Sequence, residues 1–164
     1  FDKAKVGLAT WPFIMAGSFL RPVGGLLADK LGGIRMLSLL YGAVALTALG
    51  VALLIKSFPL TCFALFLLMG LLGMGNGSVF QLVPQRFSDK IGAITGLVGA
   101  AGGVGGYYLN FALGHLKEST GTYASGFIAF GVLSLVALGV LKAVSARWVR
   151  DWLGAGGVVQ AAKA

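Results

Sequence analysis

One arginine stands inside an apolar run, and its chemistry is that of an anion-binding group. Arg21 lies eight residues before Asp29, which is ~12 Å along a helix that rises 1.5 Å per residue. Its guanidinium never loses its charge and offers five donors in a planar fork, which suits two-point binding of an oxyanion. The positions three and four residues away on a helix are all small: Gly17, Ser18, Gly24 and Gly25. Arg21 is therefore expected to face the protein interior or a water-filled cavity.

A structural role for Arg21 stays open as the alternative. The side chain could bond to backbone carbonyls or extend to the cytoplasmic surface. A charge this deep in a membrane costs from ~3 to more than 10 kcal/mol unless water or a partner relieves it, and such charges are functional by default. Pro22 adds weak support, because it cannot donate to the carbonyl of Ser18 and tends to kink the helix.

Uncharged polar residues and glycines gather in two later apolar stretches. Gly73, Gly77 and Gln81 fall on one i, i+4 ridge, with Asn76 and Ser78 close by. Such polar groups could line a cavity or bond across helices, and both readings stay open. A later stretch holds three GxxxG pairs: Gly92/Gly96, Gly99/Gly103 and Gly102/Gly106. These small faces predict either static close packing or sliding surfaces along an anion path. The candidate substrate-binding residues are Arg21, Asn76, Ser78, Gln81, Gly102, Gly103 and Gly106.

Groups for other chemistry are missing from these stretches. The acidic residues all lie at their ends or between them: Asp2, Asp29, Asp89, Glu118 and Asp151. This favours anion exchange over proton symport, although a segment outside this chain could hold a proton site. The lone Cys62 offers no disulfide or metal spacing, and His115 is expected at the membrane interface. No nucleophile–base pair or phosphate loop is found, so we expect no enzyme, no metal and no cofactor.

The composition indicates which kind of protein carries the candidate residues. Hydrophobic residues make up 57% of the 164 and charged residues 11%, against roughly 25% charged in a soluble domain. A chain so poor in charge must turn much of its outside to lipid. The formal charge of +8 could suggest nucleic acid, but the 13 Lys and Arg mostly border the apolar runs. That is a membrane pattern, not a phosphate-binding face.

Five apolar stretches are long enough to cross a bilayer as helices. They are residues 6–28, 34–55, 60–83, 91–116 and 122–144. Short connections make neighbours antiparallel, and the predicted fold class is an all-α polytopic bundle over 1–146. Eight Lys and Arg lie on one side and four on the other, which places the C-terminal tail, 147–164, in the cytoplasm. Trp and Arg in 147–152 indicate a headgroup anchor, with an amphipathic regulatory tail as the alternative.

A short motif between the first two stretches resembles a known loop signature. The string from Gly25 to Arg35, GLLADKLGGIR, is similar to the cytoplasmic loop motif of the major facilitator superfamily. The resemblance implies that these residues latch a cytoplasmic gate, with Asp29 contacting a neighbouring helix end and basic residues. The alternative is that the charges only fix topology. The implied gate residues are Gly25, Asp29, Lys30, Gly33 and Arg35.

Two further strings resemble the nitrate/nitrite porters within that superfamily. They are 96–107, GLVGAAGGVGGY, and 73–81, GMGNGSVFQ. The resemblance implies that the five stretches are helices 8 to 12 of a porter, and that Arg21 matches the arginine which clamps the anion with a second arginine on helix 2. Since the chain starts at Phe1 and not at Met, we expect a C-terminal fragment that lacks the N-terminal half and should not transport alone.

The resemblance implies transport of nitrate, nitrite or both by alternating access, as antiport or proton-coupled uptake. The expected partners are the anion, the lipid bilayer and the missing N-terminal half, with no nucleic acid. A facilitator carrier for another small anion or solute is the first alternative. A non-transporting membrane subunit or sensor is the second.

Overall fold

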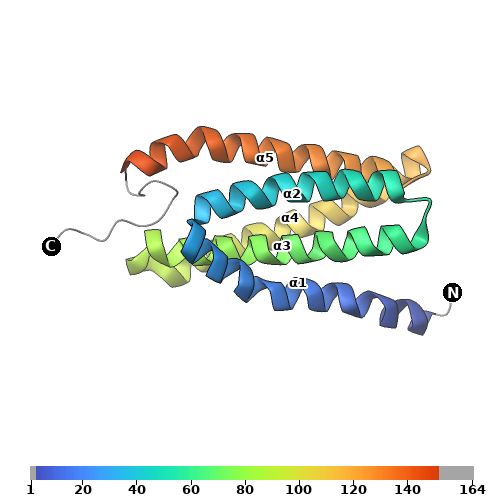
Figure 1. Ribbon diagram of the computed structural model, residues 1–164, viewed down its shortest axis with the longest axis horizontal. Helices are drawn as coiled ribbons and strands as arrows, with labels where there is room; N and C mark the ends of the chain where they lie inside the picture. Colours follow the sequence, from blue (N-terminus) through green and yellow to red (C-terminus); the bar gives the residue numbers. More distant parts are fainter. Residues whose placement is uncertain (1–2, 152–164) are drawn as a thin grey trace.

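Five long α-helices account for almost all of residues 3–151, the part of the chain that the computed structural model describes (Figure 1). They are α1 (Lys3–Leu31), α2 (Gly33–Leu54), α3 (Phe58–Arg86), α4 (Ile91–Thr120) and α5 (Ala124–Asp151). A short 3-10 turn, η1 (Ser88–Lys90), precedes α4. Residues 3–151 contain no strand, so the predicted all-α fold is confirmed.

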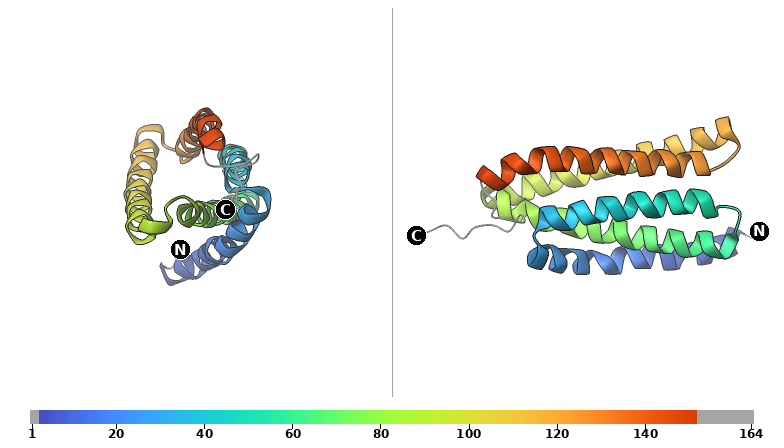
Figure 2. Two further views of the ribbon diagram at one scale, coloured as in Figure 1. Left: turned by 90° about the vertical axis from the view of Figure 1, so that its left-hand side faces the viewer. Right: turned by 45° about the horizontal axis from the view of Figure 1, so that its top comes forward.

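Consecutive helices run antiparallel, and α3 is the centre of the bundle. The α1–α2 turn, the α3–α4 turn and the end of α5 lie at the same end of the molecule (Figure 1). Helix α3 packs on α1 and on α2, and α5 covers α2. Helix α4 touches α3 and α5 only lightly and does not contact α1, so α4 stands apart from the other four (Figure 2).

Glycine permits two of the turns between these helices. Gly32, with φ 90°, is the one residue between α1 and α2, and Gly121, with φ 73°, ends α4 while its N–H bonds to the Lys117 carbonyl at 2.8 Å. Both φ values are positive, which favours glycine, and Gly121 has the left-handed conformation common at helix ends.

The helices match the predicted spans to within a few residues at most ends. The exception is α5, which continues through Arg147 to Asp151, so the helix crosses the predicted start of the tail. The side chains of the predicted headgroup anchor and residues 152–164 lie outside what the structure describes.

Within the described residues, three helices are long and apolar enough to span a membrane: Gly33–Leu54, Phe58–Gln85 and Ala124–Ser145. Helices α1 and α4 are long enough, but Arg21 and two prolines lower the hydropathy of α1, and glycines and tyrosines lower that of α4. Large apolar side chains lie bare on the outside, for example Leu53 at 83% exposed. The chain is therefore a multi-pass membrane protein, with α1 and α4 as further predicted spans.

The core is made of apolar residues, many of them the small Ala and Val. Val44, Ala48 and Val51 of α2 pack against Ala64 and Leu68 of α3. A second cluster joins α1 to α2 through Ala28, Met36 and Leu40. Small side chains let the helix axes approach closely, which is how apolar helices associate where burial from water gives no driving force.

Candidate functional site: Arg21 and the α1–α3 contact

The helix that carries Arg21 is fixed to α3 by contacts between backbones. A Cβ added at Gly73 would collide with the backbone of Gly17, and one at Gly77 would collide with the carbonyl of Arg21. One added at Gly24 would collide with the backbone of Met74. The predicted ridge of small residues on α3 therefore meets a matching set on α1. These three contacts need glycine, because any side chain would push the helices apart.

A buried hydroxyl strengthens the same contact. Ser78 is 0% exposed, and its Oγ lies 3.1 Å from the Gly24 carbonyl oxygen on α1 and 2.9 Å from the Met74 oxygen on its own helix. One hydroxyl hydrogen serves one of these acceptors at a time or is shared between them. The hydroxyl of Ser78, which was predicted to bind substrate, therefore bonds to backbone oxygens in the contact between α1 and α3.

The Arg21 side chain leaves this contact and is exposed on the surface of the bundle. Arg21 was predicted to face the protein interior or a water-filled cavity, and this stays a prediction for the longer protein; within residues 3–151 the side chain is not enclosed. The reason is that Gly77 brings the α3 backbone onto the Arg21 carbonyl, so no room is left there for a guanidinium. The small residues around Arg21 therefore make room for the packing of α3 and not for a cavity. Among the described residues Arg21 has no hydrogen bond or ion pair.

The predicted gate loop is tied to α3 through an amide. Gln81 Nε2 donates a hydrogen bond to Asp29 Oδ1, which joins the end of α1 to the C-terminal half of α3. Gln81, also a candidate for substrate binding, is therefore placed beside the loop. Sequence reasoning did not single out Gln85, although it follows Gln81 by one turn. Both side-chain carbonyl oxygens, Gln81 Oε1 and Gln85 Oε1, are buried without a hydrogen-bond partner among the described residues.

The other loop residues divide into packed glycines and exposed cations. Gly33 is buried, and a Cβ there would collide with the side chain of Leu82. Gly25 lies against Gly77 on α3, where an added Cβ would be 3.7 Å from the carbonyl oxygen. Lys30 and Arg35 are exposed, with no ion pair among the described side chains.

The remaining candidates lie elsewhere in the bundle. Asn76 lines a cavity of about 330 Å³ between α3, α2 and α5, with Tyr41 and Ser134. Gly102, Gly103 and Gly106 on α4 are exposed, and a Cβ added at any of them would meet nothing within 4 Å. The structure therefore brings Gly73, Gly77 and Ser78 to α1 and Gln81 to Asp29, and it leaves Asn76 and the α4 glycines apart from Arg21.

Three relatives each match more than four fifths of this chain. The chain is 36% identical over 140 residues to the nitrite extrusion protein of Bacillus subtilis, covering 83% of this chain and 34% of that protein. It is 34% identical to the probable nitrate transporter NarT of Staphylococcus haemolyticus, covering 85% and 37%. The match to NarT of Staphylococcus aureus is 32%, covering 86% and 36%. The chain is related to the nitrate/nitrite porters.

This relationship confirms the resemblance carried by the glycine strings. The chain spans about a third of the length of these relatives. No family model matches it, and no solved structure does. These relatives are named as transporters.

Proposed function

We propose that this chain is part of a nitrate or nitrite transporter that works by alternating access. Relatives named for nitrite extrusion and for nitrate transport, each matching more than four fifths of the chain, support this. Because the chain spans about a third of their length, we propose the activity for a longer protein in which another segment completes the site. In that protein the end of the bundle with Asp29 would face the cytoplasm, as the count of basic residues predicts.

The observation that carries the proposal is the Arg21 side chain, which is exposed and has no hydrogen bond or ion pair among the described residues, ten residues before the end of the apolar helix α1. A permanent charge at that depth requires water or a partner of opposite charge. A planar oxyanion supplies one, since it accepts two parallel hydrogen bonds from a guanidinium. The segment that covers Arg21 in the whole transporter would supply the rest of the shell around the anion.

We propose fewer residues around the anion than the sequence alone suggested. Ser78 is bonded to backbone oxygens and Gln81 to Asp29, so we propose that they hold α1 and the loop in place. Asn76 faces α2 and α5. The open glycines of α4, Gly102 among them, leave backbone accessible for close approach by another helix or by the anion.

Anion flux into vesicles tests the proposal with the longer natural protein that contains this chain. Labelled nitrate or nitrite outside and unlabelled nitrite inside should give counterflow. Arg21→Lys keeps the charge but removes the fork, and the loss of one charge-assisted hydrogen bond, ~1.5–3 kcal/mol, predicts roughly tenfold to more than hundredfold weaker uptake at low anion concentration. Lys56→Gln, at the opposite end of the bundle from Asp29, is the matched control and should transport normally.

Two results would defeat the proposal. Absence of nitrate and nitrite flux in protein of normal stability would point to another solute or to a non-transporting subunit. Full activity of Arg21→Lys would show that two-point binding by this side chain is not used.

A further inference from the structure

One face of α1 is left open by the other described helices, and it carries two polar side chains one turn apart. Ser18 and Arg21 are both exposed, and a spacing of three residues makes them neighbours on the helix surface. The contact with α3 is made through Gly17 and Gly24, on a different side of α1. Ile14, one turn before Ser18, is 60% exposed, so the open face continues towards the start of the helix.

The hydroxyl of Ser18 has no hydrogen bond among the described residues. Three hydroxyls on other helices do have one. Those of Ser38, Thr47 and Ser78 each donate to the carbonyl oxygen one turn earlier in the same helix, at 2.7–2.9 Å. Such a bond is the common way for serine and threonine to satisfy their hydroxyl inside a helix. Since an unpaired polar group costs free energy away from water, Ser18 requires a partner that these helices do not supply.

Ser18 lies at the middle of α1, fifteen residues after Lys3 and thirteen before Leu31. At 1.5 Å per residue it is ~17 Å from Asp29 along the helix, and this is about half of the ~30 Å hydrocarbon core. Transporters bind their substrates near the midplane of the bilayer. Side chains on a helix lean towards its N-terminus, which takes the Arg21 guanidinium towards Ser18. Both donors are therefore expected at the depth of a transport site.

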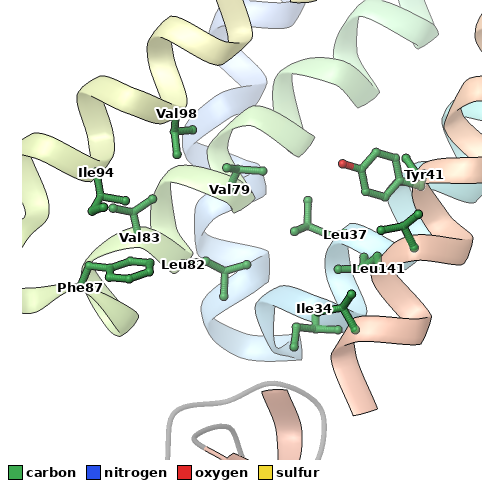
Figure 3. Close-up of a pocket in the computed structure, with 13 residues that line it drawn as sticks. Ile34, Leu37, Tyr41, Val79, Leu82, Val83, Phe87, Ile94, Val98 and Leu141 are labelled. Carbon is green, nitrogen blue, oxygen red and sulfur yellow. The ribbon is translucent and has the colours of Figure 1, made fainter. Parts of the chain in front are cut away.

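An apolar cavity elsewhere in the bundle offers no alternative place for an anion. It has a volume of about 890 Å³ and lies among α2, α3, α4 and α5, and no residue of α1 lines it (Figure 3). Among its lining side chains only Tyr41 brings a polar atom, its hydroxyl. A negative ion there would lose its hydration and find a single donor, which is a costly exchange.

We propose that Ser18 donates a hydrogen bond to the anion that Arg21 binds, an inference that rests on the proposed transport of nitrate or nitrite. The guanidinium fork holds two oxygens of the planar ion. The Ser18 hydroxyl, one turn away on the same face, donates to an oxygen of the same ion. An oxygen that carries negative charge accepts a stronger hydrogen bond than a neutral one does, so this serine contributes to affinity without adding a second positive charge.

Uptake of labelled nitrate or nitrite into vesicles, measured over a range of anion concentrations, tests this with the longer natural protein. Ser18→Ala should raise the half-saturating concentration about tenfold or more, the effect of losing one hydrogen bond to a charged group. Ser18→Thr keeps the hydroxyl and should stay close to the unmodified protein. Ser38→Ala is the matched control, because the Ser38 hydroxyl already bonds to the Ile34 carbonyl, and it should transport normally.

A double variant distinguishes a shared ion from two independent roles. If Ser18 and Arg21 bind the same anion, Ser18→Ala should weaken half-saturation much less in an Arg21→Lys background than in the unmodified protein. A serine that only packs against another helix would lower stability and the maximal rate by the same factor in both backgrounds. Unfolding in detergent is therefore measured for each variant.

Two results would overturn this inference and leave the proposed function standing. Unchanged half-saturation in Ser18→Ala, with Arg21→Lys impaired, would show that the hydroxyl does not bind the ion. Equal effects of Ser18→Ala in both backgrounds would assign Ser18 to helix packing. Absence of nitrate and nitrite flux in the unmodified protein would defeat the proposed function, and this inference with it.

Discussion

The backbone contact between α1 and α3 makes a sharp prediction about two glycines on the same helix. Gly77 lies against the Arg21 carbonyl, where a Cβ would collide with backbone atoms, whereas a Cβ at Gly75 would meet nothing within 4 Å. The same single methyl group, added two residues apart, should therefore have opposite effects on stability.

The magnitude follows from two opposing terms. Alanine improves helix propensity by up to ~1 kcal/mol over glycine. At Gly77 the methyl also forces the helices apart, and overpacking of this kind costs about 1–3 kcal/mol. The backbone cannot move aside as a flexible side chain can, so the upper part of that range applies. Gly77→Ala should lose about 1–2 kcal/mol net, and Gly75→Ala should be neutral or gain up to ~1 kcal/mol.

Reversible unfolding in mixed micelles of mild detergent and SDS, followed by circular dichroism, measures both variants. Gly73→Ala, next to Gly17 in the same contact, should behave as Gly77→Ala does. The double variant should lose less than the sum, because the first substitution already opens the contact. The reasoning is refuted if Gly77→Ala is as stable as Gly75→Ala.

Two further predictions concern single polar and turn residues, and both are measured in the same unfolding assay. Ser78→Ala should destabilise by about 1 kcal/mol, because it removes the buried hydroxyl and its hydrogen bond to the backbone oxygens of Gly24 and Met74, while Ser88→Ala in the exposed turn should change little. Gly32→Ala should destabilise by roughly 1–3 kcal/mol, because the backbone at φ 90° and ψ 130° is strained for a residue with a Cβ, and an unchanged midpoint would contradict that reading of the α1–α2 turn.

The helices could be predicted because a bilayer restricts what the chain can do. Runs of about 20 apolar residues have to form helices there, since backbone groups find no water to bond. The breaks fall where Gly32, Ser57 and Gly121 stand between such runs. The extension of α5 to Asp151 was missed, because a helix that leaves the membrane no longer needs apolar residues.

Side-chain direction was harder to predict than position. The glycines on either side of Arg21 showed that something approaches α1 closely, but a glycine ridge serves an approaching helix as well as a cavity. Which of these applies depends on α3, whose own glycines face Gly17 and the Arg21 carbonyl. The role of Gln81 was hard to predict for a similar reason. Its position on the same ridge of α3 as Gly73 and Gly77 could be predicted, but its hydrogen-bond partner Asp29 lies 52 residues away in the sequence.

The glycines of α3 and those of α4 have different roles in this structure, and the difference matters for the proposed transport. On α3 the glycines let the backbone pack directly on the backbone of α1, and the Ser78 hydroxyl bonds across the contact to Gly24. Helices α1 and α3 are therefore expected to move as one unit that carries Arg21. On α4 the glycines have open space around them, and α4 makes only slight contact with its neighbours. Alternating access needs one rigid body to move against another around a fixed site. Any surface that slides should therefore lie along α4 and not between α1 and α3, so a disulfide that fixes α1 to α3 should leave transport intact.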